Sequence, residues 1–494
     1  MSLPLNHWLP LIGLAFAMAS FRLPPALAQS IVPAKDGTGT IVTPDGNQFQ
    51  ITGGQISGDG ANLFHSFTQF GLDPHQVANF LSNPAIQNIL GRVVGGDPSL
   101  INGLIQVSGS QANLYLMNPA GIIFGTDARL NVAGDFFATT ATQIGFENHQ
   151  TFDAFGSNDY QNLVGTPFQF TFQDGQSGAI INAGALQVAE EQNLALFGST
   201  VINTGNLTAA EGEIIIAAIP GTNRVRISQV GQVLSLEVTV PSTGNAQGMQ
   251  VLDLPALLTG EITDATGIRV NPAGELVLNA DTVLAPIDMG TTLVSGQVDV
   301  TGEQGGNIQI FGDRVGLLGA NLNASGVQGG GNIWVGGDYQ GQGEMPTARV
   351  TYISPDSTLR ANTTAAGDGG QVIVWADETT RFYGNIEARG GATFGDGGFV
   401  EVSGKENLAV EGTVDVTAPL GSAGTILLDP RNIQILNISP PGPDDSKIAD
   451  GEIFANEDPT ETYVISVSAL EALSGTVRLE ATDTISIADS LNLR

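Results

Sequence analysis

The residue types that most often carry catalysis are few and scattered in this sequence. After residue 28 the histidines are His65, His75 and His149, and their spacing matches no metal-ligand motif. Cleavage of an acidic polysaccharide needs carboxylates that bind calcium and a Lys or Arg base. No lysine lies in an obvious carboxylate cluster. The lysines are Lys35, Lys405 and Lys447. The sequence therefore predicts no catalytic residue and no enzyme.

One repeated tetrapeptide could concern a metal ion. Gly-Asp-Gly-Gly occurs at 367–370 and again at 395–398. It is similar to part of the calcium-binding nonapeptide repeat, but the two copies lie too far apart for that tandem period. Turn glycines beside a solvated Asp explain the pattern as well. No Gly-rich stretch leads from a strand into a helix, as a phosphate-binding loop requires. We therefore predict no cofactor and no metal.

Composition limits the partners of the chain and suggests its route. The 494 residues include 49 acidic and 17 basic side chains, giving a net charge of −32, so nucleic acid is excluded as a partner. The apolar run Leu9–Ala19 and the small residues around Ala28 predict a signal peptide over 1–28. The chain has no Cys. Disulfides form readily in the periplasm, so their absence suits a chain that must cross a second membrane unfolded.

Short apolar runs broken by Gly, Asn, Asp and Pro predict many strands and almost no helix. Gly-Gly pairs begin at 305, 330, 369 and 397, and Ala423-Gly424 is related to them. Apolar residues follow each start at the third and fifth positions, which places both on one face of a strand. They are Ile308, Ile333, Val372, Val400 and Ile426, then Ile310, Val335, Val374, Val402 and Leu428. Stacking the copies buries these faces continuously, as in a solenoid.

Three further features refine this solenoid. The long interval between Gly330 and Gly369, which contains Met345-Pro346, predicts a loop that leaves the stack. Asn307 and Asn332 share one repeat position, so they form either an amide ladder or solvent-facing turns. Thr40–Val42, a turn at Pro44-Asp45-Gly46, and Phe49 with Ile51 predict a hairpin. An open stack needs a cap, and the N-terminal segment is the candidate.

The segment from Asn83 to Gly125 contains two Asn-Pro turns. Asn118-Pro119-Ala120-Gly121 fits a type I turn, because Asn, Pro and Gly suit its first, second and last positions. Strands are predicted on either side, at 114–117 and 122–124. The same tetrapeptide recurs at 271–274, so the turn alone identifies nothing.

The ordered set of motifs resembles the N-terminal domain of filamentous haemagglutinin-like exoproteins of two-partner secretion. The family motif Asn-Pro-Asn-Leu corresponds to residues 83–86 and Asn-Pro-Asn-Gly-Ile to 118–122, each with Ala at the third position here. Segments 62–67 and 134–140 also match. The resemblance is clear over about 31–146. It implies an all-β fold: a right-handed parallel β-helix (a pectin lyase-like solenoid) with an N-terminal cap and extra-helical hairpins.

The resemblance also implies a function. Residues 29–285 would form the secretion domain and 286–494 a Gly-rich β-helical stalk. A dedicated TpsB-type outer-membrane β-barrel transporter would bind the domain transiently. The protein would reach the surface of a Gram-negative bacterium, with a cyanobacterium as one candidate, and act as an adhesin on a host-cell, glycan or neighbouring-cell ligand. Alternatives are a pectate lyase-like enzyme and the front of a contact-dependent toxin. The residues expected to act in recognition or turn structure are Asn83, Pro84, Asn118, Pro119, Gly121 and Ile122.

Overall fold

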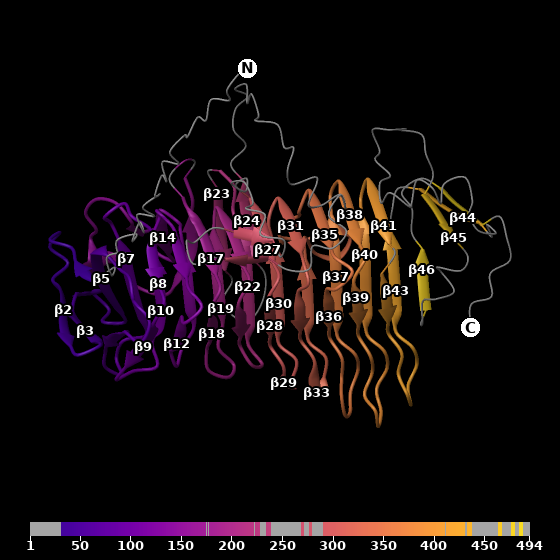
Figure 1. Ribbon diagram of the computed structural model, residues 1–494, viewed down its shortest axis with the longest axis horizontal. Coiled ribbons are helices and arrows are strands. Elements are labelled where there is room, and N and C mark those ends of the chain that lie inside the picture. The colour runs from indigo at the N-terminus through magenta and orange to yellow at the C-terminus, as the bar shows by residue number, and fades with distance from the viewer. Residues whose placement is uncertain are drawn as a thin grey trace, which may run out of the picture.

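The computed structural model describes residues 31–221 and 290–429, apart from Asp174, Gln176 and Glu411, and several strands outside these ranges. The predicted signal peptide, Lys447 and the tetrapeptide at 271–274 lie outside the described residues. The described chain forms one elongated stack of parallel strands (Figure 1). In the described ranges no helix combines the length and apolarity of a membrane span.

Three long sheets run along the stack, and each coil between residues 88 and 415 contributes one strand to each sheet. The predicted parallel β-helix is thus confirmed. Sheet A contains β1 (Val32–Pro33), β4 (Gln55–Ile56), β5 (Asn62–Gln69), β7 (Asn88–Val93), β10 (Asn113–Met117), β13 (Phe136–Thr139), β19 (Leu194–Gly198), β22 (Glu213–Ala218), β30 (Asn307–Phe311), β34 (Asn332–Val335), β37 (Gln371–Ala376), β40 (Phe399–Gly404), β43 (Thr425–Asp429) and β46 (Thr476–Leu479).

Sheet B contains β2 (Thr40–Asp45), β3 (Gln48–Gly53), β6 (Val77–Leu81), β9 (Leu104–Ser108), β12 (Arg129–Asn131), β18 (Ala185–Gln187), β21 (Asn206–Thr208), β28 (Gln297–Asp299), β32 (Asn321–Asn323), β36 (Thr358–Arg360), β39 (Asn385–Glu387) and β42 (Thr413–Asp415). Sheet C contains β8 (Ser99–Ile101), β11 (Ile122–Phe124), β17 (Ala179–Asn182), β20 (Thr200–Asn203), β27 (Thr291–Val294), β31 (Arg314–Leu317), β35 (Val350–Ile353), β38 (Thr379–Phe382) and β41 (Asn407–Val410).

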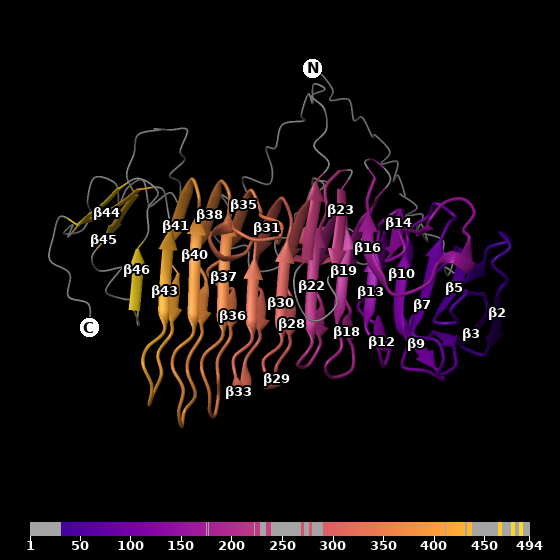
Figure 2. The ribbon, with the colours of Figure 1, turned by 180° about the vertical axis from the view of Figure 1, so that it is seen from behind.

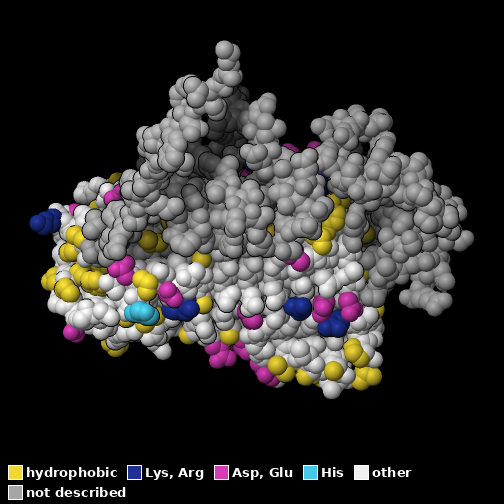
Figure 3. All heavy atoms as spheres, in the orientation of Figure 1, with side chains coloured by type: hydrophobic (Ala, Val, Ile, Leu, Met, Phe, Trp, Pro, Cys, Tyr) yellow, Lys and Arg dark blue, Asp and Glu magenta, His cyan; other side chains and the backbone are white. Residues whose placement is uncertain are grey.

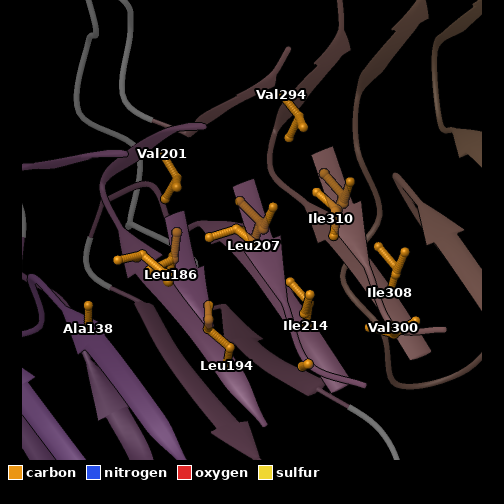
Figure 4. Packing of buried hydrophobic residues seen from close by; sticks show 14 of the residues in the cluster. Ala138, Leu186, Leu194, Val201, Leu207, Ile214, Val294, Val300, Ile308 and Ile310 are labelled. Atoms are coloured by element: carbon orange, nitrogen blue, oxygen red, sulfur yellow. The ribbon is translucent and has the colours of Figure 1, made fainter. Parts of the chain in front are cut away.

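The interior is filled by apolar residues that all three sheets direct inward (Figure 4). Their register is the one that the repeat predicts: Ile308, Ile333, Val372, Val400 and Ile426 pair in succession, and all are buried. Burying one such side chain stabilises the fold by about 1.5 to 3 kcal/mol. A single coil cannot bury them alone, so each coil depends on its neighbours.

The Gly-Gly pairs exist because successive coils touch at these positions. A Cβ on Gly331 would lie 2.0 Å from the carbonyl oxygen of Gly306, and one on Gly370 would lie 1.9 Å from that of Gly331. The backbone N–H of Asn332 also donates to the Gly306 oxygen at 3.0 Å. The second glycine of each pair therefore forms a glycine column along the rod, which no larger residue fits.

The long interval between repeats is a loop excursion, as predicted. It contains the short 3-10 helix η2 (Tyr339–Gly341), and Met345 is buried against a second apolar cluster outside the helix interior. Asn307 and Asn332 form the amide ladder, since Asn332 Nδ2 donates to Asn307 Oδ1 at 2.9 Å.

The N-terminal end of the stack is closed by antiparallel strands. Strands β2 and β3 form the predicted hairpin, and β1 and β4 both pair antiparallel with β5. The turn lies slightly later than predicted: Pro44 and Asp45 belong to β2, and the loop is Gly46-Asn47. Gly46 has φ +60°, which a two-residue hairpin loop favours and which glycine adopts without strain. The preference for glycine at this loop position explains why the turn lies later in the sequence than predicted.

A smaller antiparallel sheet packs on the outer face of sheet A in the first half of the rod. It contains β14 (Gln143–Phe146), β15 (Thr151–Asp153), β16 (Pro167–Thr171), β23 (Asn223–Ile227) and β24 (Leu234–Val238). The 3-10 helix η1 (Tyr160–Asn162) lies nearby. Aromatic rings fill the space between the two sheets. On sheet A, the ring centroids of Tyr115 and Phe137 are stacked 4.5 Å apart. Across the interface, the ring centroid of Phe170 lies 5.0 Å from that of Phe197. Figure 2 shows the upright strands of sheet A and this covering layer from behind.

The remaining described strands lie outside the three long sheets. The antiparallel pair β25 (Ile268–Val270) and β26 (Leu276–Leu278) and the parallel pair β29 (Gly302–Gln304) and β33 (Gly326–Gly329) each form a two-stranded sheet. Near the C-terminus β44 (Asn432–Leu436), β45 (Tyr463–Ser466) and β47 (Thr484–Ile487) form a three-stranded sheet.

Candidate transporter-recognition site

The two Asn-Pro turns share the same local chemistry. In the first, Ile86 N donates to Asn83 O at 3.0 Å and Ala85 N donates to Asn83 Oδ1 at 3.0 Å. In the second, Gly121 N donates to Asn118 O and Ala120 N to Asn118 Oδ1, both at 3.0 Å. The first Asn therefore closes each turn with its side chain and its carbonyl. This explains how both turns form with Ala at the third position.

Their surroundings differ completely. Asn83, Pro84 and Ala85 are all exposed. Asn118 is 0% exposed, and its Nδ2 donates to Asp97 O and to Ser99 Oγ, both at 3.0 Å. The first turn is thus a surface feature, whereas the second is a buried junction.

The second turn joins three coils. The carbonyl of Pro119 accepts a hydrogen bond from Gly178 N at 2.7 Å, which belongs to the following coil. Gly121 has φ +124°, a conformation that disfavours other residues. Ile122 begins β11, is buried, and pairs with Ser99 on one side and Ile180 on the other. These contacts show that the second turn holds neighbouring coils together and sets the register of their strands. The predicted residues involved are Asn118, Pro119, Gly121 and Ile122.

Segments 62–67 and 134–140, which resemble family motifs, share one register position of sheet A, occupied by Asn62 and Asp135. Asn88 Nδ2 donates to Asn62 Oδ1 at 2.8 Å, and Asn113 Nδ2 donates to Asn88 Oδ1 at 3.1 Å. Asp135 N then donates to Asn113 Oδ1 at 2.9 Å, and Asn193 N to Asp135 Oδ1 at 2.8 Å. We call this row the polar ladder; its described members are Asn62, Asn88, Asn113, Asp135, Asn193, Glu213, Asn307 and Asn332.

Two acids occupy the ladder. Burial raises the pKa of Glu213 to about 7, although a hydrogen bond from Gln309 opposes the shift and Asp135 adds to it. Burial also raises the pKa of Asp135. Deprotonation places negative charge in a poorly solvated row of amides, which is unfavourable. The ladder therefore loses stability as Glu213 ionises.

Arg92 joins the cap, the helix and the outer sheet. Its side chain is 2% exposed. Its guanidinium donates to Asp36 Oδ2 at 2.8 Å, to Ser66 Oγ at 3.1 Å and to Asp153 O at 2.6 Å. Burial raises the pKa of Asp36, but hydrogen bonds from Ser66, Thr38 and Arg92 outweigh it and hold that pKa well below its usual range. Asp36 is therefore ionised, and the buried guanidinium has a charged partner and several hydrogen-bond acceptors, as a buried charge requires.

The histidines do not form a site. His65 is fully buried beside Phe67 and Phe80, and neither ring nitrogen has a hydrogen-bond partner among the described residues. Burial lowers the pKa of His65 to about 4, so the ring is neutral. His75 and His149 are exposed turn residues with φ of +69° and +63°.

The other candidate residues are also dispersed. Lys35 and Lys405 are exposed. Among the residues that the structure describes, no three His, Asp or Glu side chains come together in a way that could hold a metal ion. Asp368 and Asp396 of the repeated tetrapeptide lie on adjacent coils, and Asp368 Oδ1 accepts a hydrogen bond from Asp396 N at 2.8 Å.

Sequence reasoning missed Arg92 and most of the ladder. The ladder has a signal: Asn precedes two apolar residues at 62–64, 88–90 and 113–115. Arg92 has none, because its partners lie far away in the chain. The role of Arg92 can be recognised only in the folded structure, where its distant partners come together.

A secretion domain built on a parallel β-helix, with a cap, an outer sheet and two Asn-Pro turns, is the class that these features define. The family model described as TPS secretion domain matches residues 28–278, slightly more than half of the chain. The chain belongs to this family. A TPS secretion domain implies export through the outer membrane of a Gram-negative bacterium by a TpsB transporter.

Two solved structures are similar to the chain. The HMW1 secretion domain from Haemophilus influenzae is 22% identical, with a TM-score of 0.42 over 80% of this chain and 98% of that one. The filamentous hemagglutinin secretion domain is 13% identical, with a TM-score of 0.31 over 80% of this chain and 100% of that one. No curated protein matches the chain significantly.

Proposed function

We propose that this chain is a non-enzymatic exoprotein with an adhesin-like role at the surface of a Gram-negative bacterium. Residues 1–28 act as the signal peptide, 29–285 as the domain that the TpsB-type transporter binds transiently, and 286–494 as the exported stalk. The TPS match over 28–278 supports the position of the domain. Strand β22 pairs directly with β30, so the stack continues from the proposed domain into the stalk.

The different burial of the two Asn-Pro turns carries the assignment of roles. Asn83 and Pro84 are exposed and can meet a transporter without any rearrangement. Asn118 and Pro119 are buried, so they act by shaping the coils around them. Recognition by direct contact therefore belongs to the first turn, and the second turn acts through the fold.

Stacking supplies a driving force for movement across a membrane that has no ATP. Each coil that folds outside buries apolar residues against the coil before it, at about 0.8 kcal/mol per buried methylene. Refolding outside therefore opposes backward sliding. A solenoid suits this mechanism because it folds by propagation from one end.

Secretion of the full chain from cells that also express the partner barrel tests these roles. We expect deletion of residues 31–146 to abolish export. Asn83→Ala with Pro84→Ala is expected to reduce the secreted fraction at least fivefold, while the purified variant keeps its unfolding midpoint. Asn118→Ala is expected to lower the midpoint and the secreted fraction together.

The exposed turn residue Asn148 provides a matched control, and Asn148→Ala should leave both readouts unchanged. Full export of the deletion variant would refute the domain assignment. Loss of export in Asn118→Ala at an unchanged unfolding midpoint would transfer direct recognition to the second turn.

A further inference from the structure

The stalk carries a thin fin that projects from the rod between sheets B and A. It consists of residues 301–306, 325–331, 362–370, 389–398 and 417–424, and it forms the fringe along the lower edge of Figure 1. Neighbouring coils bond within it: Ala365 N donates to Val327 O at 3.0 Å, and Thr393 N to Ala365 O at 2.9 Å. The fin is therefore an ordered extension of the stack.

The outgoing and returning backbones of the fin lie in contact. A Cβ on Gly326 would lie 2.0 Å from Gly329 O, and one on Gly391 would lie 2.6 Å from Phe394 O. With no room for side chains inside, the fin presents them outward and at its tip. Figure 3 shows hydrophobic side chains gathered along this edge, where Val327, Phe394 and Leu420 are exposed.

A groove of about 530 Å³ follows the corner where the fin meets sheet A. Glycines of the repeated pairs form its floor. One wall comes from the fin and the other from the first residues of successive sheet A strands. The wall residues are Asp368, Asp396 and Ser422 on the fin, and Asn332, Gln371, Phe399 and Thr425 on sheet A.

The fin wall offers acceptors at a fixed spacing. Asp396 Oδ1 accepts from Ser422 N at 2.7 Å, just as Asp368 Oδ1 accepts from Asp396 N. These bonds fix the orientation of each carboxylate, and both side chains remain exposed. A carboxylate can accept several hydrogen bonds, so each retains capacity for hydroxyl groups.

The sheet wall adds amides and a ring. Gln371, Phe399 and Thr425 pair in register on adjacent strands. Asn332 Nδ2 donates within the polar ladder. An amide both donates and accepts, as does a sugar hydroxyl. The ring of Phe399 is half-buried beside Tyr339 at 5.8 Å and gives the groove one apolar surface.

We infer that this groove binds a neutral glycan chain lying parallel to the rod axis. Coils repeat at about 4.8 Å, close to the length of one sugar unit in an extended glycan, so successive units meet equivalent walls. Hydroxyl-rich polymers satisfy mixed acceptors and amides, and a sugar face packs on a phenyl ring. The two carboxylates and the net charge of −32 repel acidic glycans. The inference names a ligand class for the proposed surface role and rests on it.

Native electrophoresis of the purified full chain through gels containing hydroxyethyl cellulose, mannan or polygalacturonate tests the inference. We expect at least one neutral polymer to retard the protein and polygalacturonate to leave it unaffected. Asp396→Asn keeps an acceptor for Ser422 N but loses the charge that strengthens hydrogen bonds from sugar hydroxyls. This variant and Phe399→Ala should each weaken retardation at least fivefold. Leu420→Ser at the fin tip is the control and should behave as wild type.

Circular dichroism and the unfolding midpoint establish that each variant is folded. Should Phe399→Ala fail to fold, Asp396→Asn decides alone. The inference is overturned by absence of retardation in both neutral gels, by retardation that the groove variants leave unchanged, or by stronger retardation with polygalacturonate. None of these results bears on export, which the secretion assay measures separately.

Discussion

The two halves of the rod share one backbone architecture but hold it together differently. In the first half, each coil has its own contacts: the cap, the buried second Asn-Pro turn, the bonds of Arg92 and the aromatic contact with the outer sheet. In the second half, neighbouring coils repeat the glycine column and the same Ile and Val positions. The first half is therefore a unique structure suited to recognition. The second is a repeat in which damage remains local.

The largest expected effect is at Arg92. Arg92→Ala leaves Asp36 without its ion partner and removes the bonds to Ser66 and Asp153. Breaking a buried pair in this way costs about 3 to 5 kcal/mol. Denaturant unfolding of the purified chain should show this loss. The exposed Arg389 is the control, because an exposed pair contributes less than about 1 kcal/mol. Equal losses of unfolding free energy in Arg92→Ala and Arg389→Ala would contradict the proposed difference between the two halves of the rod.

A smaller and more local effect is expected in the glycine column. Gly370→Ala places a methyl group against the Gly331 carbonyl, and overpacking of this kind costs about 1 to 3 kcal/mol. Hydrogen exchange should show lost protection in β34, β37 and β40, with β7 and β10 still protected. Ala392→Ser, on the exposed fin, should leave the pattern unchanged. Loss of protection along the entire rod would mean that the second half is as cooperative as the first.

The sequence predicts the second half better than the first. The repeated apolar positions and the Met345-Pro346 excursion follow from local pattern, because strand periodicity and Gly-Gly spacing record contacts between adjacent coils. The cap hairpin is also predicted, within a small shift of its turn. In contrast, the sequence shows two equivalent Asn-Pro turns, and only the fold reveals that Asn118 is buried and Asn83 exposed. Arg92 and the outer sheet depend on contacts between distant segments, which no local pattern records.

The two turns provide the next test. Asn118→Ala removes the bonds to Asp97 O and Ser99 Oγ and leaves the buried Ser99 hydroxyl without this donor, so about 1 to 3 kcal/mol should be lost. Asn83→Ala, at the surface, should cost less than about 1 kcal/mol, the effect of losing an exposed turn bond. Thermal unfolding of both purified variants measures the difference. Equal midpoints would show that burial does not distinguish the turns.

The smallest effect concerns pH at the boundary between the halves. Folding raises the pKa of Glu213 from 4.5 to about 7, chiefly because the side chain is buried. Stability from its protonated form is therefore complete below about pH 4.5, declines as the pH rises and is lost above about 7. Glu213→Gln should be more stable than wild type by about 1 to 2 kcal/mol at pH 8 and similar at pH 4.5. Gln297→Asn, at an exposed position of sheet B, carries no ionisable group and is the control, so its stability relative to wild type should not vary with pH. If Glu213→Gln differed from wild type in unfolding free energy by the same amount at every pH, ionisation of Glu213 would not be the cause.

The polar ladder also has a polarity. Wherever two ladder amides bond side chain to side chain, the later coil donates and the earlier accepts, as Asn88 does to Asn62, Asn113 to Asn88 and Asn332 to Asn307. At the start, Asn62 Nδ2 is already saturated by the carbonyls of Leu163 and Gly165. A coil that has just docked therefore presents an acceptor, and the amide of the coil that follows is the complementary donor. The row therefore acts as a directional template for the addition of coils, and the coil that contains Asn62 is its starting point.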